Sequence, residues 1–308
     1  MSTNTYFRYT APHNCDSVEI NDRRDLIFVG MYEYEESSSS RGGGFLIMNP
    51  KTGKIENTIV TTEYGCLDAK WTSNSDLVIA CSDGNIRTYS NDTQIVSCAL
   101  VVDSSNSNNS TAKILMALDV QNTLCAVISA KGQVSLLEIE SLASPLMSWE
   151  AHSPVIESWT CALSPTANVL VTGSDDCCLK FWDTKSSDLI FSNSKSHRMG
   201  TTAIKFLNDN ELLSGSYDDR IRRFDLRNLS EPIMEQKSIG GIWRLKPEND
   251  KLFVAACYGG CQILSLNDLL PIITYAEHKS MAYGIAPIDA KTAVSCSFYD
   301  KQVLCWEF

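Results

Sequence analysis

Short runs of alternating apolar and polar residues recur along this chain and are separated by turn-forming residues. The segment Ala151–Lys185 is the strongest example. In it, an alternating run is followed by a Ser-Pro turn, a second run reads VLVTGSDD, and a third run ends in Trp182-Asp183. Alternation with a period of two residues buries one face of an extended chain, and tight turns between such runs join antiparallel strands. The pattern therefore predicts short antiparallel β-strands.

The same pattern repeats in units of roughly 40–50 residues, which is the signature of a repeat architecture. Besides Ala151–Lys185, the copies are Cys15–Val60, Tyr64–Ser90, Ile114–Glu140, His197–Asn228, Gly240–Leu266 and His278–Phe308. The last unit supplies only three strands, so the segment Thr5–Tyr9 is expected to add the fourth. Such pairing of the chain ends closes a ring and removes exposed sheet edges.

Marker residues recur at fixed spacing within the units. An aspartate stands six residues before an aromatic residue in four units, at Asp83, Asp176, Asp218 and Asp300, and three units carry a histidine upstream, at His152, His197 and His278. This spacing resembles the WD-repeat family, and the resemblance implies four strands per blade with His, Asp and Trp in a buried network. We expect an all-β fold, a seven-bladed WD40 β-propeller that forms one domain over residues 1–308 and is closed by the N-terminal strand.

Charge and hydropathy narrow the class of protein. With 37 acidic and 26 basic residues, the chain has a formal net charge of -11. It lacks the basic excess that binds phosphates, so no nucleic-acid partner is expected. No apolar run reaches the roughly 18–20 residues needed to cross a bilayer, and the N-terminus does not resemble a signal peptide. We expect a cytoplasmic, monomeric protein without a membrane partner.

Cysteines and catalytic motifs give mostly negative information. Without a secretion signal, the 12 cysteines are expected to be free, buried thiols. Cys257 and Cys261 are too isolated for a zinc site, so neither a metal nor a cofactor is expected. The chain has no GxSxG, HExxH, GxxxxGK[ST] or GxGxxG sequence. The spacing of His152, His197 and His278 assigns these histidines to the repeat network.

Aromatic residues occupy two repeated positions at one end of the units. Near the start of the first strand of a unit stand Trp159, Trp243 and Tyr283. One residue before the marker aspartate stand Tyr217 and Tyr299, with Asp175 in the fourth unit. In a propeller both positions lie at the mouth of the central channel, and Glu157 and Arg244 are close to the first in sequence. Aromatic faces and carboxylates together suit a quaternary ammonium cation. The alternative is that the rings pack the top of the channel or bind a protein loop.

Four segments resemble the WD-repeat diphthine methylesterase family: HRMG at His197–Gly200, GSYDDRIRRFDLRN at Gly215–Asn228, GGIWRLK at Gly240–Lys246 and CSFYDKQVLCWEF at Cys296–Phe308. The resemblance is specific over the second half of the chain. It implies an enzyme of diphthamide biosynthesis that removes the methyl ester from methylated diphthine on translation elongation factor 2, before the final amidation. That protein substrate carries a trimethylammonium group near the ester, which matches the expected pocket.

The residues do not single out a catalytic group. Ester hydrolysis needs an activated water and donors for the oxyanion. The candidate bases are Glu157, Asp175 and Asp219, with His197, and the candidate oxyanion donors are Arg244 and backbone N–H groups. For Asp219 and Arg244 the alternative is an ordinary ion pair. The alternative function is a non-enzymatic WD-repeat scaffold for protein complex assembly, which needs no catalytic motif.

Overall fold

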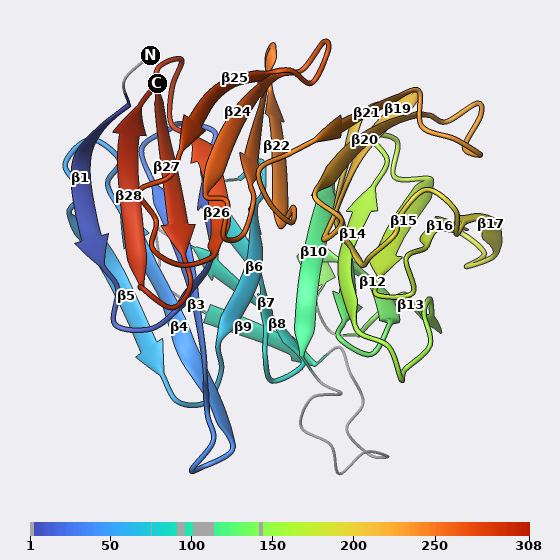
Figure 1. Ribbon diagram of the computed structural model, residues 1–308. Helices are drawn as coiled ribbons and strands as arrows, with labels where there is room; N and C mark the ends of the chain where they lie inside the picture. Colours follow the sequence, from blue (N-terminus) through green and yellow to red (C-terminus); the bar gives the residue numbers. More distant parts are fainter. Residues whose placement is uncertain (1–2, 75, 91–95, 101–113, 142–143) are drawn as a thin grey trace.

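Seven antiparallel sheets of four strands each form the molecule (Figure 1). The computed structural model describes residues 3–74, 76–90, 96–100, 114–141 and 144–308. The first strand of every sheet contacts the first strand of the next sheet, and the last sheet returns to the first. The sheets are therefore the blades of a closed ring, and the expected seven-bladed β-propeller is confirmed.

Each blade is numbered in chain order, and its strands run outward from the central channel. Blade 1 contains β2 (Cys15–Ile20), β3 (Ile27–Glu35), β4 (Ser40–Met48) and β5 (Ile55–Thr61), and blade 2 contains β6 (Cys66–Trp71), β7 (Asp76–Cys81), β8 (Asn85–Ser90) and β9 (Val96–Leu100). Blade 3 contains β10 (Leu115–Gln121), β11 (Leu124–Ser129), β12 (Gln133–Glu138) and β13 (Met147–Glu150). Blade 4 contains β14 (Ser158–Leu163), β15 (Val169–Ser174), β16 (Leu179–Asp183) and β17 (Leu189–Asn193). A short 3-10 helix, η2 (Ile139–Ser141), follows β12.

Blade 5 contains β18 (Thr201–Asn208), β19 (Glu211–Ser216), β20 (Arg220–Asp225) and β21 (Met234–Lys237). Blade 6 contains β22 (Arg244–Glu248), β23 (Lys251–Ala255), β24 (Cys261–Ser265) and β25 (Pro271–Tyr275). Blade 7 contains β26 (Ala282–Pro287), β27 (Thr292–Ser297) and β28 (Gln302–Glu307), together with β1 (Asn4–Thr10). The described residues contain no helix long and apolar enough to cross a membrane.

The N-terminal strand completes the last blade. β1 pairs antiparallel with β28, with Thr5 opposite Trp306 and Tyr9 opposite Val303. The two chain ends consequently lie side by side in Figure 1. Residues of β1 alternate between exposed and partly buried positions, as expected for an outer strand with one face on the core. The predicted closure of the ring is confirmed.

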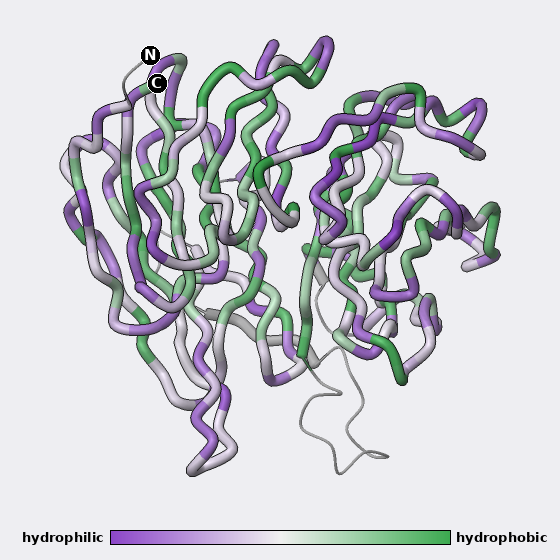
Figure 2. The backbone as a smooth tube through the Cα atoms, viewed as in Figure 1, coloured by the Kyte–Doolittle hydropathy of each residue, from purple (hydrophilic) through white to green (hydrophobic). Residues whose placement is uncertain are grey.

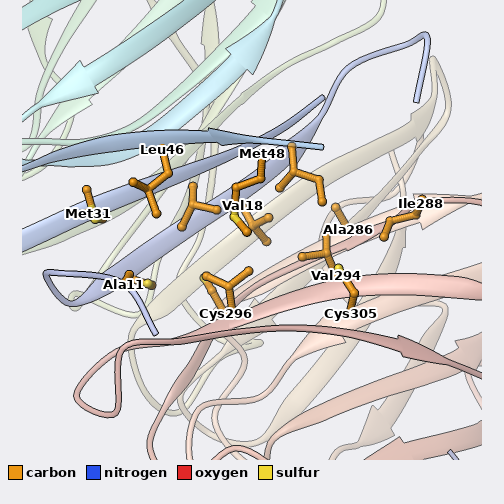
Figure 3. Packing of buried hydrophobic residues seen from close by; sticks show 14 residues of the cluster. Ala11, Val18, Met31, Leu46, Met48, Ala286, Ile288, Val294, Cys296 and Cys305 are labelled. Carbon is orange, nitrogen blue, oxygen red and sulfur yellow. The ribbon is translucent and has the colours of Figure 1, made fainter. Parts of the chain in front are cut away.

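The core lies between neighbouring blades. Figure 2 shows hydrophobic residues along the strands, whereas the tip of the β3–β4 hairpin is hydrophilic. At the junction of blades 1 and 7, Val18 and Met31 pack with Val294 and Cys305 (Figure 3). Eleven cysteines among the described side chains are free, and nine of them are buried. For these eleven residues the expectation of free thiols is confirmed, while Cys98 lies outside the described side chains.

The markers of blade 4 form the predicted buried network, with one member that the spacing did not indicate. His152 Nε2 lies 2.9 Å from Thr172 Oγ1, and Trp182 Nε1 donates to the same oxygen at 3.0 Å. His152 Nδ1 lies 2.7 Å from Asp176 Oδ2. The threonine hydroxyl therefore links the histidine of the blade entrance to the tryptophan of the third strand.

Blades 5 and 7 repeat the link through a hydroxyl group, with serine in place of threonine. Nδ1 of His197 and of His278 has no hydrogen-bond partner among the described residues, so the marker aspartate does not join the network there. In blade 7, Ser295 Oγ lies 2.7 Å from His278 Nε2 and accepts from Trp306 Nε1 at 3.1 Å. In blade 5, Ser214 Oγ lies 2.8 Å from His197 Nε2. Phe224 replaces the tryptophan there and has no polar hydrogen to donate, so the network of blade 5 is one bond shorter.

Candidate functional site

A β-bulge marks the same place at the start of the first strand in six blades. The bulged residues, one per blade, are Asp16, Leu67, Met116, Trp159, Thr202 and Tyr283. In blade 6, Trp243 occupies this place and donates its backbone N–H to Ala255 at 2.8 Å. A bulge re-aims the side chain of its extra residue. The predicted equivalence of Trp159, Trp243 and Tyr283 is confirmed, and the Trp243 ring contacts the rings of the other two.

The second repeated position is the residue directly after the second strand of a blade. Its backbone N–H donates a hydrogen bond to a carbonyl in the connection that leads into the first strand of the same blade. The N–H of Asp175 bonds to Glu157 O at 2.9 Å and that of Tyr217 bonds to Gly200 O at 3.0 Å. In blade 7 the equivalent donor is Phe298, which bonds to Met281 O at 3.0 Å. The placement of Tyr299 at this position is therefore wrong.

The loop of blade 7 explains this difference. Five residues separate Gly215 from its partner Ile221 on the next strand, but six separate Cys296 from its partner Val303. Because this loop has one extra residue, the residue directly before the marker Asp300 is Tyr299, which follows the equivalent residue Phe298. Tyr299 is 64% exposed and meets the cluster only through the edge of Phe298, with ring centroids 5.0 Å apart.

The aromatic side chains of blades 4 to 7 form one continuous cluster, which we call the mouth cluster: Trp159, Tyr217, Trp243, Tyr283 and Phe298. Ring centroids of Trp159 and Trp243 are 5.6 Å apart, and those of Trp243 and Tyr283 are 4.3 Å apart with nearly parallel planes. Tyr217 lies 6.0 Å from Trp159 and 5.9 Å from Trp243. At these separations the rings touch one another, so the cluster presents a wall of ring faces and edges.

Glycine permits the close approach of blades 4 and 5 at this wall. A Cβ at Gly200 would overlap Asp175 Oδ1 and would press on the Tyr217 ring. Because glycine has no Cβ, the carboxylate and the phenol ring can lie on either side of the same backbone segment. The HRMG segment thus contributes to the site through its final glycine.

Asp175 places a negative charge at the outer edge of the mouth cluster. Its side chain is exposed, and Oδ1 accepts the indole N–H of Trp159 at 2.6 Å. This bond fixes the Trp159 ring while leaving the second carboxylate oxygen free for another partner. A cation over the partly exposed rings would therefore meet both π-electron density and a carboxylate.

A second carboxylate, Asp16, lies beneath the rings and was missed from the sequence. It is 5% exposed, and burial raises its pKa to about 7, against the opposing effect of Arg244. It occupies the bulged position of blade 1, next to Tyr283 of blade 7 in the ring. Extending the alignment of Trp159, Trp243 and Tyr283 to the first unit, where the strand reads CDSVEI, would have found it.

Arg244 crosses the channel below the mouth cluster. Its Nη2 reaches Leu67 O of blade 2 at 3.3 Å, and Asp68 and Asp16 lie 3.8 and 4.0 Å from the same nitrogen. Although burial opposes ionisation, Lys70 and Arg244 lower the pKa of Asp68 to about 2. Arg244 therefore sits between a firmly ionised carboxylate and one that titrates near neutral pH.

Deeper in the channel the charges pair with one another. Lys70 Nζ lies 2.7 Å from Glu19, and Lys246 also binds Glu19. Burial lowers the pKa of Lys246 to about 8, against the opposing charge of Glu19. The cavity beside these groups measures about 20 Å³, which is room for a single water molecule.

The structure does not bring all candidate bases to the mouth cluster. His197 is 4% exposed within the blade 5 network, where burial and Arg222 lower its pKa to about 3. The structure thus places His197 in the buried network, with its ring against Phe224, and does not bring it to the mouth cluster. Glu157 is exposed and contributes its carbonyl, which accepts from Ser174 Oγ at 2.9 Å.

Asp219 also acts through its backbone. It adopts a left-handed conformation with φ of 63°, and its carbonyl accepts the N–H of Ser238 at 2.8 Å. Among the described residues, no group of three or more His, Cys, Asp or Glu could hold a metal ion. Of the proposed polar residues, Asp175 and Arg244 are thus the two that lie against the aromatic rings.

Comparison with known proteins supports the fold. The family model described as "WD domain, G-beta repeat" matches residues 143–183. A chain in the "Crystal Structure of Mitotic Checkpoint Complex" superposes with a TM-score of 0.81 at 14% identity, covering 100% of this chain and 92% of the other. At this identity the likeness concerns the fold alone.

Three similar curated proteins share one name. "Diphthine methyltransferase homolog" from Dictyostelium discoideum is 30% identical, with 82% of this chain and 78% of that protein covered. "Diphthine methyltransferase" from Schizosaccharomyces pombe is 29% identical, with 92% and 91% covered. The protein of the same name from Saccharomyces cerevisiae is 24% identical, with 92% and 93% covered.

This name contradicts the hydrolysis expected from the sequence. The relatives are named for transfer of a methyl group, whereas the resemblance implied removal of a methyl ester by water. The ester-hydrolase prediction is corrected on this finding. It had rested on the resemblance alone, since no motif assigned a nucleophile. The scaffold alternative gains no support from the relatives either.

Proposed function

Since this chain belongs to the diphthine methyltransferase family, we propose that it is an enzyme of diphthamide synthesis that acts at the methylation of diphthine. Its proposed protein substrate is translation elongation factor 2 carrying diphthine. The proposed role of the mouth cluster is to hold the methylated ammonium group of that modified side chain. The continuous aromatic wall beside Asp175 is the observation that supports this role.

Ring faces attract a methylated ammonium because its charge is spread over methyl groups and it cannot donate hydrogen bonds. Each favourable cation–π contact contributes about 0.5–2 kcal/mol, depending on how dry the contact is. Trp159, Tyr217 and Tyr283 are partly exposed and offer such contacts at the surface of the cluster. Asp175 adds a full charge beside Trp159, so the site favours a cation over a neutral amide or ester.

Burial beneath the rings gives Asp16 a complementary role. A carboxyl group with a pKa of about 7 is partly ionised at neutral pH and can accept a proton or add negative charge. Asp16 lies 4.0 Å from Arg244 Nη2, and the Arg244 guanidinium carbon lies 5.6 Å from the centroid of the Trp243 ring. Asp16 therefore adds its negative charge on the Arg244 side of the cluster, whereas Asp175 lies beside Trp159.

The name of the relatives also implies a methyl donor. Nucleotide-bearing donors are commonly held by a strand, a glycine-rich loop and the N-terminus of a helix. The described residues contain no α-helix and do not form such a cradle. They do not fit this mode of donor binding.

The test uses elongation factor 2 from cells arrested before the final amidation. Purified chain and a sulfonium methyl donor are added, and the mass of the modified peptide is followed. We expect the number of methyl groups on diphthine to increase by one. Trp159→Ala should slow this transfer about tenfold, which corresponds to losing a contact worth about 1.4 kcal/mol.

A tryptophan outside the mouth gives the matched control. Trp149 packs on Trp182 with centroids 6.0 Å apart and lies on β13, the outer strand of blade 3. Trp149→Phe is expected to leave the rate unchanged. An unchanged methyl count with the unmodified chain, under conditions in which the protein is folded, would contradict the proposed function.

A further inference from the structure

Positive side chains predominate around the small cavity in the channel below the mouth cluster. The charged residues that line this cavity are Asp68, Lys70, Lys205, Arg244 and Lys246. They come from the first strands of blades 2, 5 and 6. None of the mouth-cluster rings lines the cavity. Its chemistry is therefore separate from that of the mouth.

Lys70 is fully occupied by hydrogen bonds within the protein. Its Nζ donates to Glu19 at 2.7 Å, to Ala69 O at 2.9 Å and to Asp68 at 3.3 Å. An ammonium group has three N–H donors. Lys70 therefore has no donor left for a ligand and is the standard against which the other two lysines are compared.

Lys205 and Lys246 have unused donors. Among the described residues, the ammonium group of Lys246 bonds to Glu19 alone, which leaves it two N–H groups. Lys205 Nζ has one partner in the described part of the chain, Asp119, at 3.5 Å. This distance is long, because strong bonds between charged groups measure about 2.7–2.9 Å. The two lysine side chains are 25% and 20% exposed, so their spare donors face an enclosed space.

Arg244 also has few strong partners for an enclosed guanidinium. Its two hydrogen bonds, to Trp243 O and Leu67 O, are both 3.3 Å long. The carboxylate oxygens of Asp68 and Asp16 lie 3.8 and 4.0 Å from Nη2. A guanidinium has five N–H donors. Arg244 is thus a third cation with donor capacity beside the cavity.

The positive groups lie close enough to affect one another. Burial lowers the pKa of Lys246 to about 8, and the charges of Lys70 and Lys205 act in the same direction, against Glu19. The carboxylates that contact the four cations are Asp16, Glu19, Asp68 and Asp119. Asp16, whose pKa is about 7, is only partly ionised at neutral pH. Positive charge is therefore in excess around the cavity, and an anion between the ammonium groups would offset their repulsion.

We propose that this cavity binds one monatomic anion of the class of chloride. The donors are the N–H groups of Lys205, Lys246 and Arg244 that lack strong partners. A cavity of about 20 Å³ accommodates a single water molecule or a monatomic ion, but not sulfate, in which four oxygen atoms surround the sulfur. The anion joins blade 5 to blade 6 from inside the ring. This binding site is independent of the proposed function, because it involves none of the mouth-cluster rings.

Chlorine NMR tests the proposal in solution. The full chain is freed of chloride by dialysis against sodium gluconate and is then titrated with sodium chloride at constant ionic strength. Bound chloride relaxes rapidly, so exchange with the site broadens the chloride line. We expect bromide to remove this broadening by competition, and sulfate at equal ionic strength to leave it unchanged. The formal net charge of -11 keeps non-specific chloride binding low.

Variants assign the binding to its residues. Lys205→Met removes the charge but keeps the length of the side chain, and Asp119 keeps the N–H of Leu163 at 2.9 Å as a partner. We expect chloride to bind this variant about tenfold more weakly, as for the loss of one bond to a charged group. Lys246→Met, in which Glu19 keeps Lys70, should show the same loss.

A lysine outside the channel gives the matched control. Lys180 is 22% exposed and lies 3.7 Å from Asp176, so its burial and its ion pair resemble those of Lys205. It stands on β16, the third strand of blade 4, and does not line the cavity. Lys180→Met is expected to leave the chloride affinity unchanged.

Crystals of the full chain soaked in sodium bromide locate the anion by its anomalous scattering. A peak between Lys205 and Lys246 supports the proposal, whereas peaks on the outer surface alone indicate an adventitious ion only and overturn it. Equal broadening by the unmodified chain and by Lys205→Met, with unchanged far-ultraviolet circular dichroism, also overturns it. Absence of broadening does the same, because the cavity then holds only water. None of these results bears on methylation of diphthine, so the two proposals fail separately.

Discussion

Asp16 illustrates how one buried carboxyl group can connect the chemistry of the mouth to the stability of the fold. In an unfolded chain its pKa lies near 3.9, whereas burial raises its pKa to about 7 in the folded protein. Below the unfolded value both states are protonated. Between the two values the unfolded state releases its proton first, so the free energy of unfolding decreases as the pH rises towards 7.

Replacing Asp16 by asparagine should remove this pH-dependent loss. The amide has a similar shape and stays neutral, so Asp16→Asn is expected to be more stable than the unmodified chain at pH 8, by on the order of 4 kcal/mol, with little difference at pH 4. Urea unfolding at both pH values measures the difference. Equal stabilities at pH 8 would show that Asp16 ionises without cost in the folded state.

The same residue predicts the pH dependence of ligand binding. Ionisation of Asp16 adds negative charge beside the cluster, so the affinity for tetramethylammonium is expected to rise as the pH increases through about 7. Asp16→Asn should flatten this profile, while Asp175→Asn should lower the affinity at every pH above 6 without flattening it. NMR titrations between pH 6 and 8 test both statements.

At the scale of the strand, the linking hydroxyl group on the second strand of a blade can bond to one or to two buried side chains. Ser295 serves both His278 and Trp306, whereas Ser214 serves only His197, and both serines are fully buried. An unpaired buried donor or acceptor costs about 1–3 kcal/mol. The network of blade 7 should therefore be more sensitive to loss of its hydroxyl.

We expect Ser295→Ala to lower the free energy of unfolding by about 2–4 kcal/mol and Ser214→Ala by about 1–2 kcal/mol. The two substitutions remove the same atom from equivalent positions, so each is the control for the other. Urea unfolding, followed by far-ultraviolet circular dichroism, measures the difference. Equal losses, or a larger loss for Ser214→Ala, would contradict the network interpretation.

The strands could be predicted from the sequence because their pattern is local, but the side chains at the mouth depend on register. Alternation and repeat spacing gave the blades, the closing strand and the equivalence of Trp159, Trp243 and Tyr283. The extra residue in the loop of blade 7 shifted the second position from Tyr299 to Phe298, which counting from Asp300 cannot reveal. Asp16 was missed because the markers that identify a unit are weakest in blade 1.

Contacts across the channel could not be predicted at all, since they join residues from different blades. The approach of Arg244 on β22 to Leu67 on β6 depends on the diameter of the ring and on the bulges that turn the first strands. Similarly, the sequence could not show that the rings touch one another instead of standing apart around a void. Chemistry at the mouth is therefore a property of the assembled ring.

At the scale of the whole molecule, the position of every mouth residue depends on closure by β1. This strand covers the edge of β28, and Phe7 and Tyr9 pack against the core between blades 1 and 7. Thr5 Oγ1 also lies 2.6 Å from the hydroxyl oxygen of Tyr275 in blade 6, so β1 contacts the neighbouring blade as well. An open edge at β28 would be free to pair with a second chain.

Deleting residues 1–10 is expected to lower the free energy of unfolding by about 2–4 kcal/mol, because the partial burial of the Phe7 and Tyr9 side chains is lost. It should also produce concentration-dependent self-association, measured by light scattering after size-exclusion chromatography.

A synthetic peptide of residues 3–10 should bind the truncated chain and restore the monomer. The same peptide with Tyr9→Pro should fail. Ala11 N–H bonds to Lys301 O, and donors to an antiparallel neighbour alternate along a strand, so proline at Tyr9, opposite Val303, removes a donor from the ladder. A truncated chain that stays monomeric and equally stable would show that the ring holds its shape, and with it the mouth cluster, without the closing strand.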